Sequence, residues 1–117
     1  MTPDERQELA AIADKLMIGG FHRHVFLCLG PTCCASEVGE AAWDALKREL
    51  KDRNLSLAAG PAACYRTKVG CLRVCKGGPV MVVYPEEVWY TYVDRADIDE
   101  IIDEHLVNGR VVERLRI

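Results

Sequence analysis

The sequence predicts an α/β domain in which a short mixed sheet carries helices on its faces. Two observations predict this class. Apolar residues recur at helical spacing in three segments of the chain, and short apolar runs typical of β-strands lie between those segments. The expected order of elements is helix, strand, helix, three strands and helix. Packing helices on a sheet is the natural way for such elements to bury their apolar sides.

The first half of the chain is predicted to form two helices with one strand between them. Residues 2–5 supply a capping threonine, a first-turn proline and a capping-box glutamate, and Gly19-Gly20 ends the helix. Residues 24–28 form a short apolar run, which we expect to be a buried strand. A second helix is expected from Ser36 to about Asn54. The apolar faces comprise Leu9, Ile12, Ala13 and Leu16 in the first helix, and Val38, Ala41, Ala42, Ala45, Leu46 and Leu50 in the second.

The second half of the chain predicts three strands and a helix. Residues 62–68 are compatible with a strand, and residues 79–84 are strongly apolar and rich in β-branched side chains. Residues 88–93 alternate as a paired strand does, so with the short turn before them they predict a β-hairpin. A third helix should begin after Asp94 and end near residue 108. Its apolar face comprises Ile98, Ile101, Ile102 and Leu106.

Length and charge limit the possible functions. The 117 residues provide one domain, and the net charge of -3 argues against nucleic acid as the main partner. No apolar run approaches the roughly 18 residues that a membrane-spanning helix needs. The N-terminus has neither the basic nor the apolar region of a secretory signal. We therefore expect a cytoplasmic protein, in a reducing compartment, that acts on neither nucleic acid nor membrane.

The six cysteines are the strongest functional signal. In a reducing compartment they indicate metal or redox chemistry rather than structural disulfides. Four residues separate Cys28 from Cys33 at the end of a strand. Three residues separate Cys71 from Cys75, so on a helical turn these two would share one face. Glycines around both pairs would let the backbone approach an inorganic group closely.

Spacing alone leaves several chemistries open. Four thiolates on two loops can hold a [2Fe-2S] cluster or a zinc ion. Inert buried cysteines are a further alternative, because free cysteine is commonly buried. Thiol redox catalysis is the last, and it is disfavoured because the sequence has no Cys-x-x-Cys pair.

The cysteine pattern and its surroundings resemble a known family. Residues 24–28, Cys33, residues 70–75, residues 78–85 and residues 88–90 are similar to the thioredoxin-like [2Fe-2S] ferredoxins. The same cluster module occurs in the small iron–sulfur subunit of respiratory complex I. The resemblance implies a thioredoxin-like fold, a [2Fe-2S] cluster near one surface, one-electron exchange with redox partner proteins, and often a homodimer. The ligands that it implies are Cys28, Cys33, Cys71 and Cys75.

The resemblance extends from about residue 22 to the C-terminus, and it sets the expected domain organisation. Residues 1–20 would form an N-terminal helical extension, and residues 21–117 the thioredoxin-like [2Fe-2S] ferredoxin domain. Nothing is left over for a second module, so we expect a free-standing electron carrier that is not an enzyme. The alternatives are a structural zinc-binding interaction module and a thiol–disulfide oxidoreductase that uses Cys33, Cys34 or Cys64.

Other residues near the predicted site have alternative roles. Cys34 directly follows Cys33 and would be the ligand in its place if the register differed by one residue. Cys64 is expected to be a small buried side chain. Gly78-Pro79 occupies the place where thioredoxin-like folds often have a cis proline, although it would serve equally as a trans turn. Surface or strand-edge positions are expected for the three histidines, His22, His24 and His105.

Charged and aromatic residues are unevenly placed. Residues 53–85 contain no acidic residue, whereas residues 94–104 contain six and only one arginine. The basic residues would compensate the charge of a cluster or form a docking patch, and an ordinary solvated face is the alternative. The basic residues are Arg53, Arg66, Lys68, Arg73 and Lys76.

The last strand carries the aromatic residues Trp89, Tyr90 and Tyr92. They would form a dimer surface or pack against a helix, and Trp43 is expected in an interface.

Overall fold

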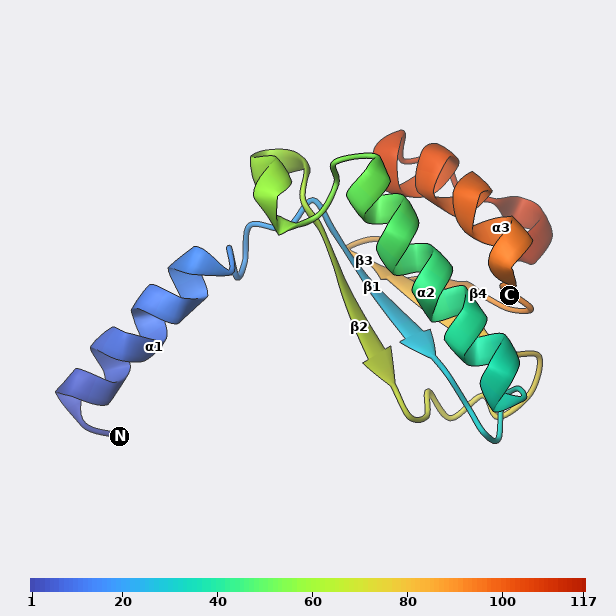
Figure 1. Ribbon diagram of the computed structural model, residues 1–117, viewed down its shortest axis with the longest axis horizontal. Helices are drawn as coiled ribbons and strands as arrows, with labels where there is room; N and C mark the ends of the chain where they lie inside the picture. The colour runs from blue at the N-terminus through green and yellow to red at the C-terminus, as the bar shows by residue number, and fades with distance from the viewer.

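A four-stranded mixed sheet forms the centre of the fold (Figure 1). Its strands are β1 (Arg23–Cys28), β2 (Cys64–Val69), β3 (Val80–Tyr84) and β4 (Val88–Tyr90). They lie in the order β2-β1-β3-β4, with β1 parallel to β2 and antiparallel to β3, and β3 antiparallel to β4. This computed structural model describes the backbone of residues 1–117 and the side chains of residues 1–56 and 60–117.

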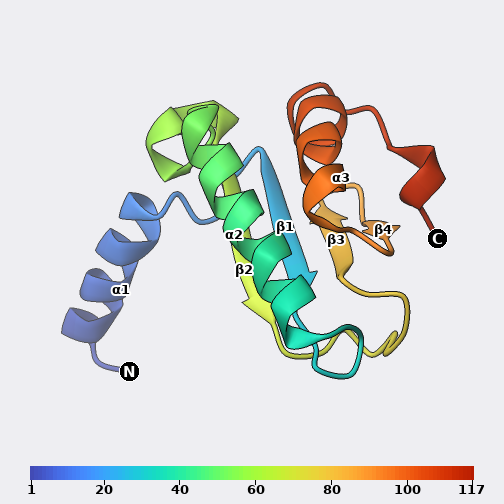
Figure 2. The ribbon, with the colours of Figure 1, turned by 45° about the vertical axis from the view of Figure 1, so that its right-hand side comes forward.

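Two helices pack on one face of the sheet. α2 (Ser36–Asp52) connects β1 to β2, and α3 (Arg95–Glu100) continues directly into a π-helical segment, Ile101–Val107. Figures 1 and 2 show both helices on the same side of the sheet. Short 3-10 segments lie at Leu57–Ala62 and Glu113–Leu115. The predicted α/β class, with helices against a short mixed sheet, is confirmed.

The main core lies between the sheet and these two helices. Alternation along β1 sends Val25 and Leu27 into this core, while Cys28 joins a smaller apolar cluster with Val80. The predicted faces of both helices supply many of the other core side chains. Those that are buried are Ala42, Ala45, Leu46 and Leu50 from α2, and Ile98, Ile101, Ile102 and Leu106 from α3 and its continuation.

The buried face of α2 differs from the predicted one at its edges. Val38 and Ala41 are exposed, whereas Trp43 lies in the core with only 8% of its surface exposed. The guanidinium carbon of Arg66, on β2, lies 5.4 Å from the centre of the Trp43 ring. A cation over an aromatic face is attracted by it and covers it. The expectation that Trp43 lies in an interface is therefore wrong.

α1 (Pro3–Lys15) projects away from the sheet, as Figure 1 shows. Its start is the predicted capping box, in which Thr2 and Glu5 exchange backbone-to-side-chain hydrogen bonds of 3.0 and 3.1 Å. None of its residues is buried, and Leu9 and Ile12 are 53% and 52% exposed. The predicted apolar stripe is present but uncovered. Among the described residues, no helix has both the length and the apolar character needed to cross a membrane.

The last strand is shorter than predicted. β4 ends at Tyr90 because Thr91 donates its N–H to the carbonyl oxygen of Leu115 and Tyr92 adopts a φ of +53°. Tyr92 then donates its N–H to Gly77, in the loop between β2 and β3. Tyr90 is completely buried and Tyr92 is 65% exposed, so these two side chains do not share one strand face.

His105 is completely buried, so its predicted surface position is also wrong. The Tyr90 hydroxyl accepts the N–H of Val112 at 3.0 Å and lies within hydrogen-bond distance, 2.8 Å, of His105 Nδ1. The opposite nitrogen, Nε2, lies 3.2 Å from Glu86, which also forms a 2.9 Å ion pair with Arg23. Residue 105 falls at helical spacing from the apolar residues of α3, and that pattern was the signal for burial.

Candidate metal centre

The two cysteine-bearing loops meet at one end of the sheet. Because β1 and β2 are parallel, their carboxyl ends lie at the same edge. Cys28 is the last residue of β1 and pairs with Val69, the last residue of β2. The segment 29–35 follows β1 and the segment 70–79 joins β2 to β3, and both run along this edge in Figures 1 and 2. We call them the first and second cysteine loops.

Two glycines allow close approach around the first cysteine loop. Gly78 donates its N–H to the carbonyl oxygen of Cys33 at 2.9 Å, and a Cβ at residue 78 would lie only 2.6 Å from that oxygen. On the other side, a Cβ at Gly39 of α2 would lie 2.5 Å from the carbonyl oxygen of Leu29. The first cysteine loop is therefore held between α2 and the second cysteine loop. The Gly78–Pro79 peptide is cis.

The four predicted thiols form two pairs, one at the junction of β1 with the first cysteine loop and one on the second cysteine loop. Cys28 and Cys33 are buried, with Sγ atoms 2.8 Å apart. Cys71 and Cys75 are exposed, with Sγ atoms 3.9 Å apart. The second pair does not lie on a helical turn. Arg73 and Cys75 instead have φ values of 71° and 58°, so an irregular loop brings the two thiols together.

Backbone N–H groups and neighbouring thiols set the protonation of these cysteines. Burial alone would raise the pKa of Cys28, but hydrogen bonds from Cys33 and from the backbone at Gly30 and Leu72 hold this pKa below its ordinary value. Burial and the adjacent Cys28 raise the pKa of Cys33 to about 12. Each of these thiols therefore responds to charge on its neighbours.

The exposed pair behaves in a similar way. Arg73 donates its backbone N–H to Cys71 Sγ at 3.2 Å. The hydrogen bond with Cys71 raises the pKa of Cys75, the charge of Cys28 raises it further, and the Arg73 guanidinium acts in the opposite direction. The pKa of Cys75 therefore depends on a cysteine of each pair.

The donor set suits a centre with two metal ions. Two thiolates bound tetrahedrally at about 2.3 Å to one ion lie about 3.8 Å apart, close to the 3.9 Å between Cys71 and Cys75. The 2.8 Å between Cys28 and Cys33 would have to open by about 1 Å through side-chain rotation. In the part of the chain whose side chains are described, no three potential ligands surround one ion position. Each pair of thiols can bind one metal ion of a two-metal centre.

The remaining cysteines lie outside these pairs. Cys34 is half-buried and its thiol donates to the carbonyl oxygen of Leu29 at 3.6 Å. Cys64 is 1% exposed, its thiol donates to Ala62, and it begins β2 at the end opposite Cys71. Burial raises the pKa of Cys64. The prediction of Cys64 as a small buried side chain is confirmed.

The other two histidines differ in exposure. His22 is exposed, as predicted, and its ring lies 2.6 Å from Arg23. His24 is half-buried on β1, where its ring stacks on Phe26 and Nε2 lies 2.8 Å from the hydroxyl of Thr67.

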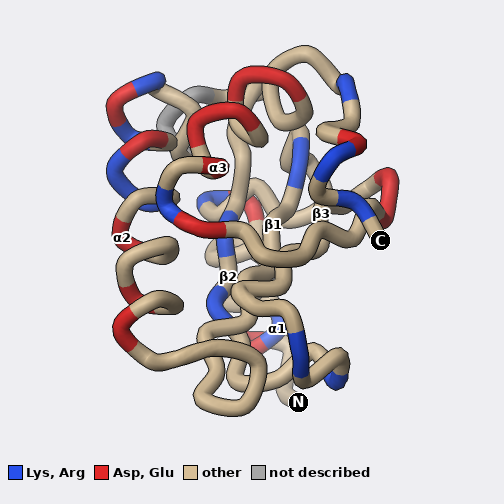
Figure 3. The backbone as a smooth tube through the Cα atoms, turned by 90° about the vertical axis from the view of Figure 1, so that its right-hand side faces the viewer, with Lys and Arg blue, Asp and Glu red and all other residues tan. Residues whose placement is uncertain are grey.

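The basic residues divide into separate groups. Arg73 and Lys76 are exposed on the second cysteine loop. Arg53 lies far along the chain from it and forms ion pairs with Glu49, Asp99 and Asp103 at 2.6, 3.1 and 2.8 Å. Figure 3 shows the acidic residues along α3 and basic residues along β2. Arg53 therefore neutralises acidic side chains of α2 and α3 and does not contribute to a surface at the thiols.

Two curated proteins that are similar to this chain are both [2Fe-2S] ferredoxins. The chain is 35% identical over 101 residues to "Ferredoxin, 2Fe-2S" of Clostridium pasteurianum, covering 80% of this chain and 94% of that one. It is 35% identical over 98 residues to "Ferredoxin, 2Fe-2S" of Aquifex aeolicus, covering 81% and 88%. No protein-family model matches the sequence.

Solved structures give the same result for the fold. The wild-type thioredoxin-like [2Fe-2S] ferredoxin of Aquifex aeolicus superimposes with a TM-score of 0.69 at 34% identity, over 81% of this chain and 95% of that one. A cysteine-to-serine variant of the same protein superimposes with a TM-score of 0.69 at 35% identity, over 81% and 97%.

Proposed function

Because the chain belongs to the family of thioredoxin-like [2Fe-2S] ferredoxins, we propose that it is a one-electron carrier with a single [2Fe-2S] cluster. Its fold is thioredoxin-like, with an additional helix at the N-terminus. In this proposal the cluster ligands are Cys28 at the end of β1, Cys33 of the first cysteine loop, and Cys71 and Cys75 of the second.

The observation that carries the proposal is the arrangement of four thiols as two pairs on loops in direct contact. Each iron of a two-iron cluster takes two protein thiolates, so one pair is available for each iron. Two of the solved Aquifex structures are cysteine-to-serine variants at positions four residues apart, which is the spacing of Cys71 and Cys75. That agreement supports the assignment of the second pair.

When bound, the cluster supplies a one-electron couple whose potential depends on hydrogen bonds to sulfur and on solvent exposure. The residues of this chain control both. The backbone N–H of Arg73 donates to Cys71 Sγ. Val80, which is completely buried, packs beside Cys28 and excludes water from the inner pair. The exposed second pair leaves the outer side of the centre open to a partner.

An electron carrier needs a surface for its partners, and it needs neither a catalytic acid nor a base. We therefore assign the chain no enzymatic activity and expect redox partner proteins to dock over the second cysteine loop. We also propose a cytoplasmic location, because six cysteines that act as cluster ligands or thiols suit a reducing compartment. Since no residue of α1 is buried, we place the boundary of the ferredoxin domain at residue 21, with residues 1–20 as an extension.

A homodimer is the expected assembly, and the uncovered face of the sheet is the surface that we assign to it. On this face Phe26 lies edge-on to Tyr84 with ring centres 5.9 Å apart, and Trp89 is only partly buried. Aromatic side chains are enriched at interface cores. Analytical ultracentrifugation of the wild type should give twice the chain mass, and Trp89→Lys should give the monomer. A monomeric wild type would contradict this assembly.

The test of the proposed function is the composition and spectrum of the purified protein. A [2Fe-2S] protein should be coloured, contain about two irons and two sulfides per chain, and give a paramagnetic signal after one-electron reduction. A colourless protein with one zinc per chain would establish the structural zinc module instead. Disulfide turnover by metal-free protein that survives loss of Cys71 and Cys75 would establish the thiol oxidoreductase.

A further inference from the structure

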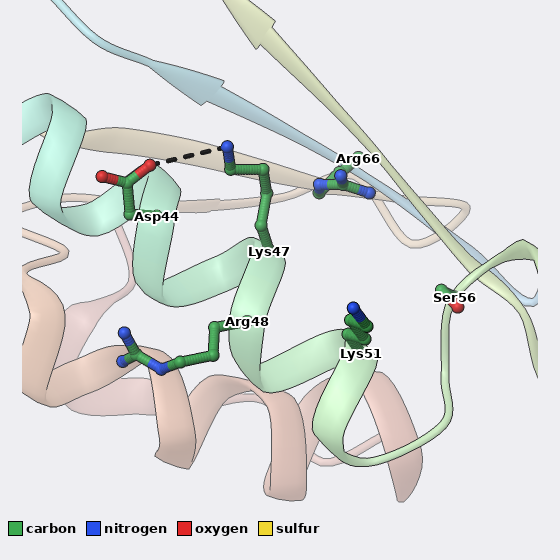
Figure 4. A pocket seen from close by; sticks show the side chains of 6 residues that line it. All are labelled: Asp44, Lys47, Arg48, Lys51, Ser56 and Arg66. Atoms are coloured by element: carbon green, nitrogen blue, oxygen red, sulfur yellow. Dashed lines mark ion pairs between the residues drawn. The ribbon is translucent and has the colours of Figure 1, made fainter.

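A basic groove lies away from the cysteine loops, between α2 and the edge strand β2. Its volume is about 600 Å³. Figure 4 shows Lys47 and Lys51 of α2 on the side toward Arg66 of β2, Arg48 extending away from Arg66, and Ser56 at one end. Four of the lining residues are basic and one is acidic. The full set is Asp44, Lys47, Arg48, Lys51, Ser56 and Arg66.

Two of the four cations lack a carboxylate partner among the described side chains. Lys47 forms a 3.5 Å ion pair with Asp44, the single acidic residue of the groove. Arg48 pairs with Glu49 at 3.3 Å, outside the lining. Lys51 and Arg66 have no carboxylate within 4.0 Å in that part of the structure. The groove therefore carries positive charge that the described residues do not neutralise.

Arg66 is held in one orientation. Its guanidinium lies over the buried ring of Trp43, with 5.4 Å from the guanidinium carbon to the ring centre. Its Nε is buried and, among the described residues, has no hydrogen-bond partner. An arginine stacked in this way presents a planar fork of donors with little loss of freedom on binding, and such a fork matches two oxygens of one oxyanion.

We propose that this groove binds a phosphate-bearing anion with two or more negative charges. Guanidinium and ammonium groups are donors only, and the Ser56 hydroxyl can also donate, so the site requires a ligand rich in acceptor oxygens. Its volume lies within the range of about 300–1,000 Å³ usual for small-molecule sites. The net charge of -3 disfavours nucleic acid as the source of these phosphates.

The groove is separate from the proposed electron-transfer centre. Arg66 pairs in the sheet with Val25, three residues before Cys28, which corresponds to about 10 Å along the strand. Occupancy of the groove should therefore leave the visible spectrum of a bound cluster unchanged. Failure of either proposal can be recognised independently of the other.

Calorimetric titration of the purified, cluster-containing protein with sodium pyrophosphate tests the proposal. We expect one site per chain. Arg66→Gln and Lys51→Gln should each weaken binding by about tenfold, because each removes a charge-assisted hydrogen bond. Arg95→Gln removes the same charge beside a different groove, on α3, and should change the affinity less than about twofold. The two tryptophan indole N–H signals locate the ligand, since that of Trp43 should shift and that of Trp89 should not.

Lys51 is exposed, so Lys51→Gln should fold even if Arg66→Gln uncovers Trp43 and does not. Tighter binding of ADP than of pyrophosphate would identify a nucleotide, and equal binding an inorganic polyphosphate; both agree with the proposal. Three results would overturn it. These are no binding of either anion, an equal loss of affinity in Arg95→Gln, and binding of an acidic peptide alone, which would make the groove a protein-docking surface.

Discussion

The backbone N–H of Gly78 donates to the carbonyl oxygen of Cys33 at 2.9 Å, and this bond joins the two cysteine loops. A proposed cluster shared between Cys33 and Cys75 depends on the spacing of these loops. The contact has no room for a side chain at residue 78, because a Cβ there would lie 2.9 Å from the Cβ of Cys33 and still closer to its carbonyl group.

Gly78→Ala should therefore separate the loops and weaken cluster retention. The neighbouring atoms belong to backbone and cannot rotate away, so the overpacking should cost about 1–3 kcal/mol of stability. Gly70→Ala is a matched control in the same loop, since a Cβ at residue 70 would meet nothing within 4 Å. The melting temperature and the visible absorbance per chain measure both effects. Equal behaviour of the two variants would show that the Gly78 contact does not set the loop spacing.

Substitution of single cysteines by serine or alanine distinguishes Cys33 from Cys34 as the cluster ligand. The Cys34 thiol donates to Leu29, whereas Cys33 lies against Cys28, so Cys33→Ser should abolish or strongly alter the visible spectrum. Cys34→Ala and Cys64→Ala should leave that spectrum intact. Bleaching by Cys34→Ala with a normal spectrum in Cys33→Ala would move the assignment by one residue.

The buried His105 should make the fold sensitive to acid. Burial lowers the pKa of His105 from 6.5 despite the opposing effect of Glu86, so the folded chain binds this proton less readily than the unfolded chain does. Stability should be complete above about pH 6.5 and should fall as the pH drops below that value, by at most about 1.4 kcal/mol per pH unit from this residue. The lowered pKa of Glu86 adds a second loss only below about pH 4.5.

Nuclear magnetic resonance titration of the imidazole in the folded protein measures this directly, and the midpoint for His105 should lie below 6.5. A midpoint at or above that value would contradict the assignment of a neutral ring between Tyr90 and Glu86. His105→Gln should reduce the pH dependence of unfolding between about pH 5 and 6.5. Some dependence should remain, because burial also lowers the pKa of His24.

Local patterns predicted much of the fold and of the candidate site. The apolar run 24–28 and the helical stripe of α2 depend on nearby residues, and both elements are present. The end of β4 depends on Leu115, which takes the Thr91 N–H from a remote part of the sequence. The burial of Trp43 likewise depends on Arg66 from the adjacent strand. Interactions of this kind between distant segments leave no pattern in the sequence. The spacing of the cysteines, in contrast, is itself a pattern that the sequence displays.

The basic residues of the second cysteine loop should raise the midpoint potential of the proposed cluster. Arg73 is the nearer of the two in effect, since the hydrogen bond with Cys71 raises the pKa of Cys75 and the charge of Arg73 opposes that rise. Positive charge favours the reduced state, which is more negative by one unit, so neutralising Arg73 and Lys76 together should lower the potential. Both side chains are exposed, and the shift should be on the order of tens of millivolts and shrink with added salt.

Lys15→Gln, on the projecting α1, is the control and should leave the potential unchanged. Protein-film voltammetry of the double variant Arg73→Gln/Lys76→Gln measures the shift. An unchanged potential with slower electron exchange would instead assign these two residues to partner docking, and no change in either would leave them as solvated surface.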